Sequence, residues 1–542
     1  MTYMKKQKWW IFALVGLVAI AIAVFVAEGY LKKRIKQELQ IQTTYGDTLQ
    51  ISKVDLGILR GWMDINDLVI RWNIPPKDSS AESLTYLIRG KIGKVQLKGL
   101  SFAQYLFRNR IQINKLLIDS SALDLHLIKS AADGSKSTPD SMVATENELA
   151  ITINGMEIAP SRIRYFVGEE AKPRFEVDAI SLNIEEFHYP QVSDTSSYVN
   201  HFSWEAKGLR YSRAEQFSDL LIANSSGSSQ DSSLTFSQLQ FLPLYSKAEY
   251  SRHLKHKDSR VEINAGQGGL KGLDWFALLS GGHIRARSFT MDSCFIEVYE
   301  DSRLPVDETR YKSLYQEKLL HAGVDISVDT AKFRHSKLTF EMRPDDPQPQ
   351  VGFLNFLDLD AVLSNITNDS AEIARDPLLR AQVNTVVNGE SELKAYFTFD
   401  LSSRDYAYTY SGEMHGFDLP EFNTILMETS QMKIAAGRMQ RLSYRVDADK
   451  RISTGEMRMD YSDLKIEWLE GHNKLAALAQ KIVMREQNPK NDNYRVGQIY
   501  HERKPFRSFW NSYLKSLLSG LNSTAMPNLF LPDELDAKKE KI

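Results

Sequence analysis

The chain has 542 residues, of which 42% are hydrophobic and 25% are charged, a composition typical of a folded protein with several hydrophobic cores. Its formal net charge is −2, from 67 basic and 69 acidic residues. The sequence therefore carries no strongly basic or acidic field, and nucleic acid is not an expected partner.

The first predicted element is a membrane anchor at residues 9–27. This run contains only apolar residues and Gly16, 19 in all. As a helix rising about 1.5 Å per residue it would be roughly 28 Å long, close to the hydrocarbon thickness of a bilayer. A cleaved signal peptide is the alternative, although the run is long for one. Basic residues lie on both sides of the run, so charge does not fix its orientation.

Beyond the anchor, the sequence predicts a mainly β protein. From Thr48 onward apolar and polar residues alternate, and predicted strands recur every 8–15 residues or so with turn residues between them, as in antiparallel all-β proteins. We divide the chain into a cytoplasmic tail at 1–8, the anchor at 9–27, a juxtamembrane helix or linker at 28–47, a first β unit at 48–232, a second at 233–380, a carboxy-terminal β region at 381–470, and helices with a tail at 471–542. Short helices are expected near 420–428 and 472–487.

The two β units contain a duplicated segment, residues 92–127 and 265–300. Lys98-Gly99-Leu100 reappears as Lys271-Gly272-Leu273, 173 residues later, and the same offset holds through the following strand. Looser matches align 48–52 with 233–237 at an offset of 185, and 177–180 with 359–362 at 182. Each copy is a stretch of sheet that cannot bury its apolar face alone and needs neighbours.

Three features resemble the AsmA-like and TamB-like envelope proteins, relatives of the chorein-type lipid-transfer proteins. These are the amino-terminal anchor, the early run 51–70, and a carboxy-terminal block that includes 417–423 and 459–466. The resemblance implies a long, curved antiparallel sheet, anchored by one span in the bacterial inner membrane, with the bulk of the chain in the periplasm. Its apolar concave face would form a β-groove that carries phospholipid toward the outer membrane, without enzymatic activity.

Both copies of the duplicated segment supply candidates for the lining of this groove. The candidates are the alternate apolar residues Ile111, Ile113, Leu116, Ile118, Leu123 and Leu125 in the first copy, and Ile284, Phe289, Met291, Ile296 and Val298 in the second. A β-sandwich that buries two sheets against each other fits the same alternation. In that case the chain would be an envelope scaffold or assembly factor rather than a lipid carrier.

The last predicted element is an amphipathic helix that ends at Gly520. Its apolar stripe has helical spacing and consists of Phe506, Phe509, Trp510, Tyr513, Leu514, Leu517 and Leu518. The stripe either packs on the end of the sheet or contacts a membrane or an envelope protein.

Catalytic chemistry is not expected. The sequence has no nucleophile elbow, phosphate loop or His-Glu-x-x-His motif. Cys294 is the only cysteine, which excludes an internal disulfide. His253 and His256 could share a helix face as metal ligands, but the basic residues beside them favour a solvated segment. We therefore predict no catalytic residue, metal or cofactor.

The sequence does not specify the lipid class, the direction of movement, an energy source or the oligomeric state.

Overall fold

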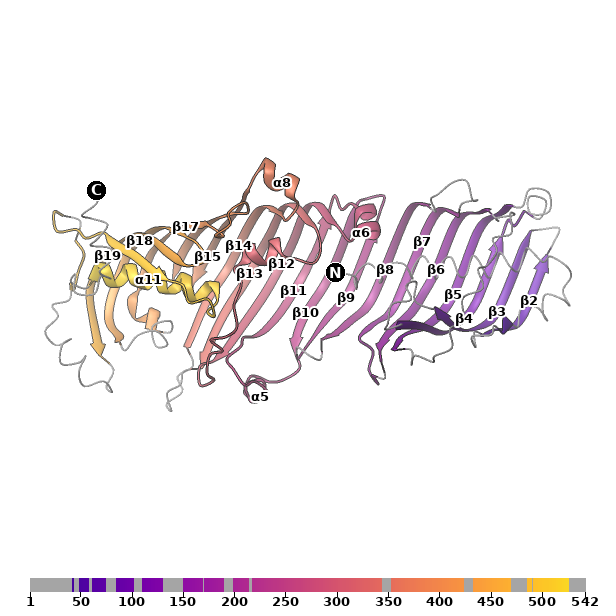
Figure 1. Ribbon diagram of the computed structural model, residues 1–542, viewed down its shortest axis with the longest axis horizontal. Coiled ribbons are helices and arrows are strands. Elements are labelled where there is room, and N and C mark those ends of the chain that lie inside the picture. The colour runs from indigo at the N-terminus through magenta and orange to yellow at the C-terminus, as the bar shows by residue number, and fades with distance from the viewer. Residues whose placement is uncertain are drawn as a thin grey trace. The chain divides into compact units, whose positions relative to one another are not determined.

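The computed structural model describes residues 41–42, 48–57, 61–74, 84–101, 110–129, 150–168, 170–189, 198–213, 217–343, 352–423, 432–468, 485–489 and 491–525. The chain divides into two compact units, whose helices and strands are labelled in Figure 1. The first comprises residues 1–240 with 271–281, and the second comprises 241–270 with 282–542.

The first unit is built from strands that pair in chain order. They are β1 (Ile41–Gln42), β2 (Thr48–Gly57), β3 (Trp62–Ile74), β4 (Leu84–Lys98), β5 (Arg110–Lys129), β6 (Ala150–Val167), β7 (Phe175–Tyr189), β8 (Tyr198–Arg213), β9 (Ser218–Ser228) and most of β10 (Ser233–Pro243), with the short helix α6 (Trp275–Gly281). From β1 to β9 every neighbouring pair is antiparallel except β5 and β6, which are parallel.

The second unit combines a sheet with several helices. Its strands are β11 (Arg260–Lys271), β12 (Ile284–Asp301), β13 (Ile326–Arg343), β14 (Gly352–Thr367), β15 (Leu378–Val387), β16 (Ser391–Asp400), β17 (Tyr408–Asp418), β18 (Met432–Ala448), β19 (Ile452–Trp468) and β20 (Gly497–Glu502). Its helices are α5 (Lys247–Arg252), α7 (Tyr315–Leu320), α8 (Ser370–Arg375), the 3₁₀ turn η3 (Leu419–Phe422) and α11 (Phe509–Ala525). β12 and β13 are parallel, and each later neighbouring pair through β20 is antiparallel.

The predicted mainly β fold is confirmed, but the prediction of an antiparallel sheet is wrong in one respect, because the sheet is mixed. Parallel neighbours need a connection of a dozen residues or more, since the chain must return to the end at which it started. The connection after β5 spans 130–149, and the one after β12 spans 302–325 and contains α7. Both are long enough, although length alone does not require a parallel pair, because the longer connection at 469–496 joins the antiparallel strands β19 and β20.

The parallel pair recurs seven strands later, which places β5 and β6 in correspondence with β12 and β13. A second repeated feature is a backbone hydrogen bond at a left-handed turn. Leu100 N–H donates to the Gly61 carbonyl at 2.8 Å, and Leu273 N–H donates to the Ser232 carbonyl at 2.8 Å. Gly61 has φ of 62° and Ser232 has φ of 49°. This equates β3 with β10, so the match of 48–52 with 233–237 was wrong. The match failed because alternating apolar and polar residues occur in every strand of this kind and do not distinguish one strand from another.

The duplication also preserves β-bulges. The Ser161 hydroxyl donates to the Ala159 carbonyl at 2.8 Å, and the Ser336 hydroxyl donates to the Arg334 carbonyl at 3.0 Å. The pairing register shifts at both serines. Ser161 pairs with Ile180 and Ser336 with Leu359, which gives an offset of 179 for the next strand rather than the 182 inferred from the sequence.

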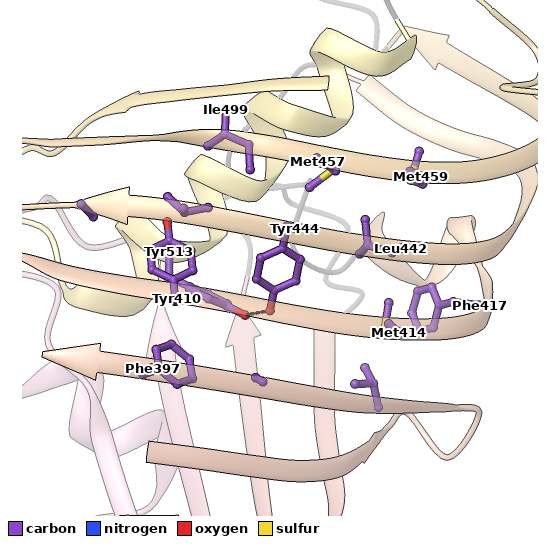
Figure 2. Close-up of a cluster of buried hydrophobic side chains, with 14 of the residues drawn as sticks. Phe397, Tyr410, Met414, Phe417, Leu442, Tyr444, Met457, Met459, Ile499 and Tyr513 are labelled. Carbon is purple, nitrogen blue, oxygen red and sulfur yellow. Dashed lines mark hydrogen bonds between the residues drawn. The ribbon is translucent and has the colours of Figure 1, made fainter. Parts of the chain in front are cut away.

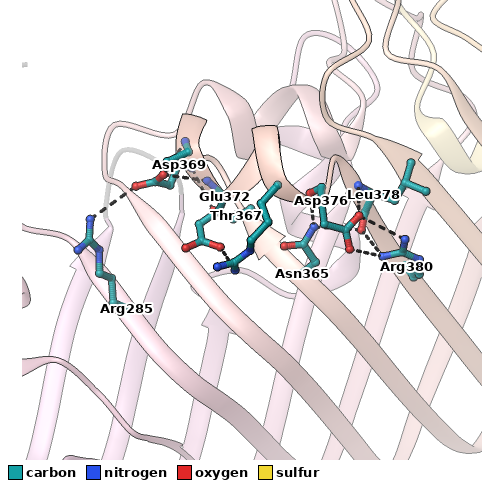
Figure 3. Close-up of polar contacts among 10 residues, drawn as sticks. Arg285, Asn365, Thr367, Asp369, Glu372, Asp376, Leu378 and Arg380 are labelled. Atoms are coloured by element: carbon teal, nitrogen blue, oxygen red, sulfur yellow. Dashed lines mark hydrogen bonds and ion pairs between the residues drawn. The ribbon is translucent and has the colours of Figure 1, made fainter.

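A further left-handed residue lies near one end of β7 and of β14. Glu186 has φ of 53° and Asn365 has φ of 60°, again 179 residues apart. The Asn365 side-chain amide donates to the carbonyls of Asp376 and Leu378 at 2.7 and 3.1 Å (Figure 3). It thereby ties this position of β14 to the segment that leads from α8 into β15.

Several predictions fall outside the described residues. These include the anchor at 9–27, the juxtamembrane linker apart from 41–42, and residues 472–484 of the predicted helix at 472–487. Among the helices that the structure does describe, none combines the length and the apolar character needed to cross a bilayer. The boundaries at 232, 380 and 470 stay predictions.

Candidate apolar groove

Cross-strand pairing in the second unit builds a continuous apolar face. Met291 lies beside Phe333, and Phe333 lies beside Ala361. Directly paired residues share one face of a sheet. These paired residues therefore form a row across the strands, which continues from Ala361 through Val383 to Ala395. Three further rows run across the same strands: Phe289–Ala331–Leu363, Ile296–Leu338–Phe356 and Val298–Phe340–Leu354.

The larger side chains of these rows are only partly buried on β12 and β13. This holds for all five candidates of the second copy: Ile284, Phe289, Met291, Ile296 and Val298. It also holds for Phe333, Leu338 and Phe340, which the sequence analysis missed. Their neighbours on the opposite face of β13 include Lys332 and Arg334, so the two faces differ clearly in polarity.

Helix α11 covers the same face where it extends onto β16 to β20. Phe397 pairs with Tyr410, and Tyr410 pairs with Val446. Phe509 and Tyr513 of α11 are buried against this region, with the ring centroids of Phe397 and Tyr513 5.8 Å apart (Figure 2). This part of the face is therefore a closed core.

Hydroxyl groups join α11 to the sheet inside that core. The hydroxyls of Tyr444 and Tyr513 lie 2.6 Å apart, and those of Tyr410 and Ser516 lie 2.5 Å apart. Burial raises the pKa of all three tyrosines well above their usual range. The neutral hydroxyl is therefore the stable form, and it satisfies polar atoms that would otherwise be buried without a partner.

The side of α11 that faces the sheet consists largely of small residues. Ser512, Ser516, Gly520 and Thr524 follow one another at intervals of four and are buried. A Cβ on Gly520 would lie 2.7 Å from Ile499 Cγ1 and 3.1 Å from Met457 Cβ. Gly520 therefore permits close packing inside the helix. The prediction that it ends the helix was wrong, because α11 continues to Ala525.

The larger apolar residues of α11 lie beside this buried stripe. Trp510, Leu514, Leu517, Leu518 and Leu521 are partly buried and pack at the margin of the core. Trp510 also approaches Phe340, with ring centroids 6.2 Å apart. The predicted stripe thus packs within the second unit, except for Phe506, which precedes the helix. This packing does not test contact with a membrane or partner.

The candidates of the first copy have a different environment. Ile111, Ile113, Leu116, Ile118, Leu123 and Leu125 are each 0–5% exposed. The first four belong to one buried cluster with residues of β2, β3, β4, β6 and β7. Equivalent positions are therefore tightly enclosed in one copy and partly accessible in the other. The accessible apolar surface that we can assign to the duplicated segment is that of β12, and β13 extends it.

Among the residues that the structure describes, no three His, Cys, Asp or Glu side chains are grouped as metal ligands. Cys294 is 2% exposed, and burial raises the pKa of its thiol, which disfavours the thiolate. His253 stacks on Tyr245 with ring centroids 3.9 Å apart.

Comparison of the chain with known protein families and with curated proteins finds no match.

Proposed function

We propose that the chain is a membrane-anchored envelope protein that shields the acyl chains of phospholipids on the apolar face of β12 to β14. Residues 9–27 would anchor it in the bacterial inner membrane, with the sheet in the periplasm. The protein would assist phospholipid transport or outer-membrane homeostasis without enzymatic activity. The observation that supports this proposal is the continuous apolar surface that begins at Phe289, Met291, Ile296 and Val298 and remains partly exposed.

An apolar surface of this kind is costly to leave in water. Removing apolar area from water contributes about 25 cal/mol per Å², and large exposed apolar patches on soluble domains usually mark binding sites. Acyl chains suit the face because several rows of aliphatic and aromatic side chains lie side by side without intervening charges. A lipid could place its chains on these rows while its head group stays in water.

Site-specific photo-crosslinking tests the proposal. A benzophenone amino acid replaces Met291 or Val298 in the full chain, which is then illuminated with phospholipid vesicles and analysed by mass spectrometry for lipid adducts. We expect adducts at both positions. The matched control is Thr290, which is exposed and adjacent to Met291 in the strand, on the other face of the sheet.

A second control uses a buried position in the first copy of the duplicated segment. Ile113 is 0% exposed, so a probe there should capture protein rather than lipid. Equal labelling at Met291 and Thr290, or no lipid adduct at either groove position, would contradict acyl-chain shielding. In that case the chain would be better described as a scaffold.

A further inference from the structure

Two segments of the second unit meet to form a surface rich in aromatic and basic residues, which we call the aromatic–basic patch. It consists of Tyr311, Tyr315, Lys318, Arg503, Lys504, Phe506 and Arg507. The backbone N–H of Lys312 donates to the carbonyl of Pro505 at 2.9 Å, which holds the segment before α7 against the segment before α11.

Each aromatic ring of the patch has a cation close to it. Lys504 Nζ and the Arg507 guanidinium carbon lie 5.8 and 5.9 Å from the centre of the Phe506 ring. Lys318 Nζ lies 5.8 Å from the Tyr315 ring, and the Arg503 guanidinium carbon lies 5.7 Å from the Tyr311 ring. Tyr311 and Tyr315 are nevertheless 48% and 46% exposed, so the rings remain available to an external partner.

The charge of the two segments contrasts with that of the whole chain. Residues 310–318 and 503–507 contain six basic residues and one acidic residue, Glu317, whereas the chain as a whole has a net charge of −2. Arg310 is neutralised by an ion pair with Asp258 at 2.8 Å. Arg503 is buried and donates to backbone carbonyls, including that of Lys450 at 3.3 Å.

Three cations of the patch remain for an external anion. No carboxylate among the described residues forms an ion pair with Lys318, Lys504 or Arg507. Lys318 and Lys504 are exposed, and Arg507 is partly buried. Exposed tyrosines beside unpaired lysine and arginine are the residues that favour the interface between a bilayer and water.

The patch is continuous with the candidate groove. The Tyr315 ring lies 5.2 Å from that of Phe509 and 6.4 Å from that of Trp510. Trp510 in turn approaches Phe340, which shares a row with Val298. An unbroken line of aromatic contacts therefore leads from the basic surface to the apolar face.

We propose that the aromatic–basic patch docks onto the surface of an anionic phospholipid bilayer. Lys318, Lys504 and Arg507 would contact lipid phosphates, and Tyr311 and Tyr315 would enter the interfacial layer. Charge complementarity selects this partner, since each basic residue near an anionic surface strengthens attraction to it. Docking would bring the apolar face to a source or acceptor of lipid. Only this transfer step rests on the proposed function, because docking itself does not require the groove to bind acyl chains.

A vesicle-tethering assay tests docking with the full chain. The protein is reconstituted into donor vesicles of phosphatidylcholine, and capture of acceptor vesicles is measured by fluorescence cross-correlation. Acceptors contain phosphatidylcholine with or without phosphatidylglycerol. The test variant K318Q/K504Q/R507Q removes the three unpaired charges. The control variant K337Q/R441Q/K465Q removes the same number of charges from exposed strand positions.

We expect the wild type and the control variant to capture anionic acceptors and not neutral ones, and we expect capture to weaken as salt is added. The test variant should capture anionic acceptors about tenfold less, with an unchanged thermal unfolding midpoint.

Equal capture by the two variants would overturn the proposal. Equal capture of neutral and anionic acceptors by the wild type would also overturn it. An absence of anionic capture by the wild type would point instead to an acidic protein as the partner of the patch. Acyl-chain shielding is read separately, from the crosslinks at Met291 and Val298.

Discussion

At the scale of single residues, Tyr408 makes the stability of the second unit depend on alkaline pH. It is 3% exposed, and burial raises its pKa from 10.0 to about 12. Between these values the unfolded chain releases the phenolic proton while the folded protein retains it, so the free energy of unfolding falls as pH rises. The contribution is complete below pH 10 and is lost as pH rises toward 12.

Phenylalanine has no proton to release, so the free energy of unfolding of Tyr408→Phe should fall less than that of the wild type above pH 10. We expect the difference in this decrease to be at most on the order of 3 kcal/mol. Urea unfolding monitored by fluorescence between pH 8 and pH 12 measures the effect. Tyr211→Phe is the matched control, because it removes the same hydroxyl from a position that is 40% exposed. Identical profiles for Tyr408→Phe and wild type would disprove the assignment.

The sequence predicted which residues lie on the same face of the sheet, but it did not predict how deeply each of them is buried. The candidates on β12 do lie on one apolar face with Phe333 and Leu338. Their exposure could not be read from the chain, since Ile118 and its counterpart Met291 occupy the same place in the alternation, yet Ile118 is buried and Met291 is only partly buried. Gly520 illustrates the same limit, because its role depends on the approach of Ile499 and Met457 from other strands.

At the scale of strands and turns, the duplication predicts a stabilising substitution. Ser232 holds the left-handed conformation, with φ of 49°, that Gly61 holds in the first copy. A side chain in this region costs about 1 kcal/mol that glycine avoids. We expect Ser232→Gly to raise the free energy of unfolding by about that amount.

The neighbouring residue provides a control of opposite sign. Ser233 begins the extended strand β10, where glycine lowers stability. Ser233→Gly should therefore reduce the unfolding midpoint that Ser232→Gly raises, as measured by thermal denaturation. A decrease for both variants would show that the Ser232 side chain contributes more than its backbone strain costs.

The parallel pairs show why strand direction was missed. Alternation of apolar and polar residues is the same in parallel and antiparallel strands, so the pattern of β5 or β12 contains no information on its neighbour's direction. The lengths of the connections at 130–149 and 302–325 permit parallel pairing but do not predict it, because the connection at 469–496 is longer and joins antiparallel strands.

At the scale of the whole molecule, the proposed function depends on where the apolar face remains uncovered. In the first unit the candidate residues are enclosed, and in the second α11 closes the part of the face on β16 to β20. The rows that stay partly exposed on β12 and β13 reach the buried residues Leu354 and Ala361 on β14, where they adjoin this closed core. A protein that only needed to fold would gain stability by covering these rows as well.

A charge placed in the open rows separates folding from lipid binding. Met291 is partly buried, so Met291→Asp leaves the carboxylate in contact with water when the face is empty. Acyl chains on the face would remove that water, and an unpaired buried charge is strongly unfavourable. We expect the Met291→Asp protein to fold, with an unfolding midpoint close to that of the wild type. It should retain at least about tenfold less phospholipid on purification, as measured by mass spectrometry.

The control variant Thr290→Asp introduces the same charge on the opposite face and should retain wild-type amounts of lipid. Equal lipid retention by the two variants would show that lipid does not occupy the rows around Met291.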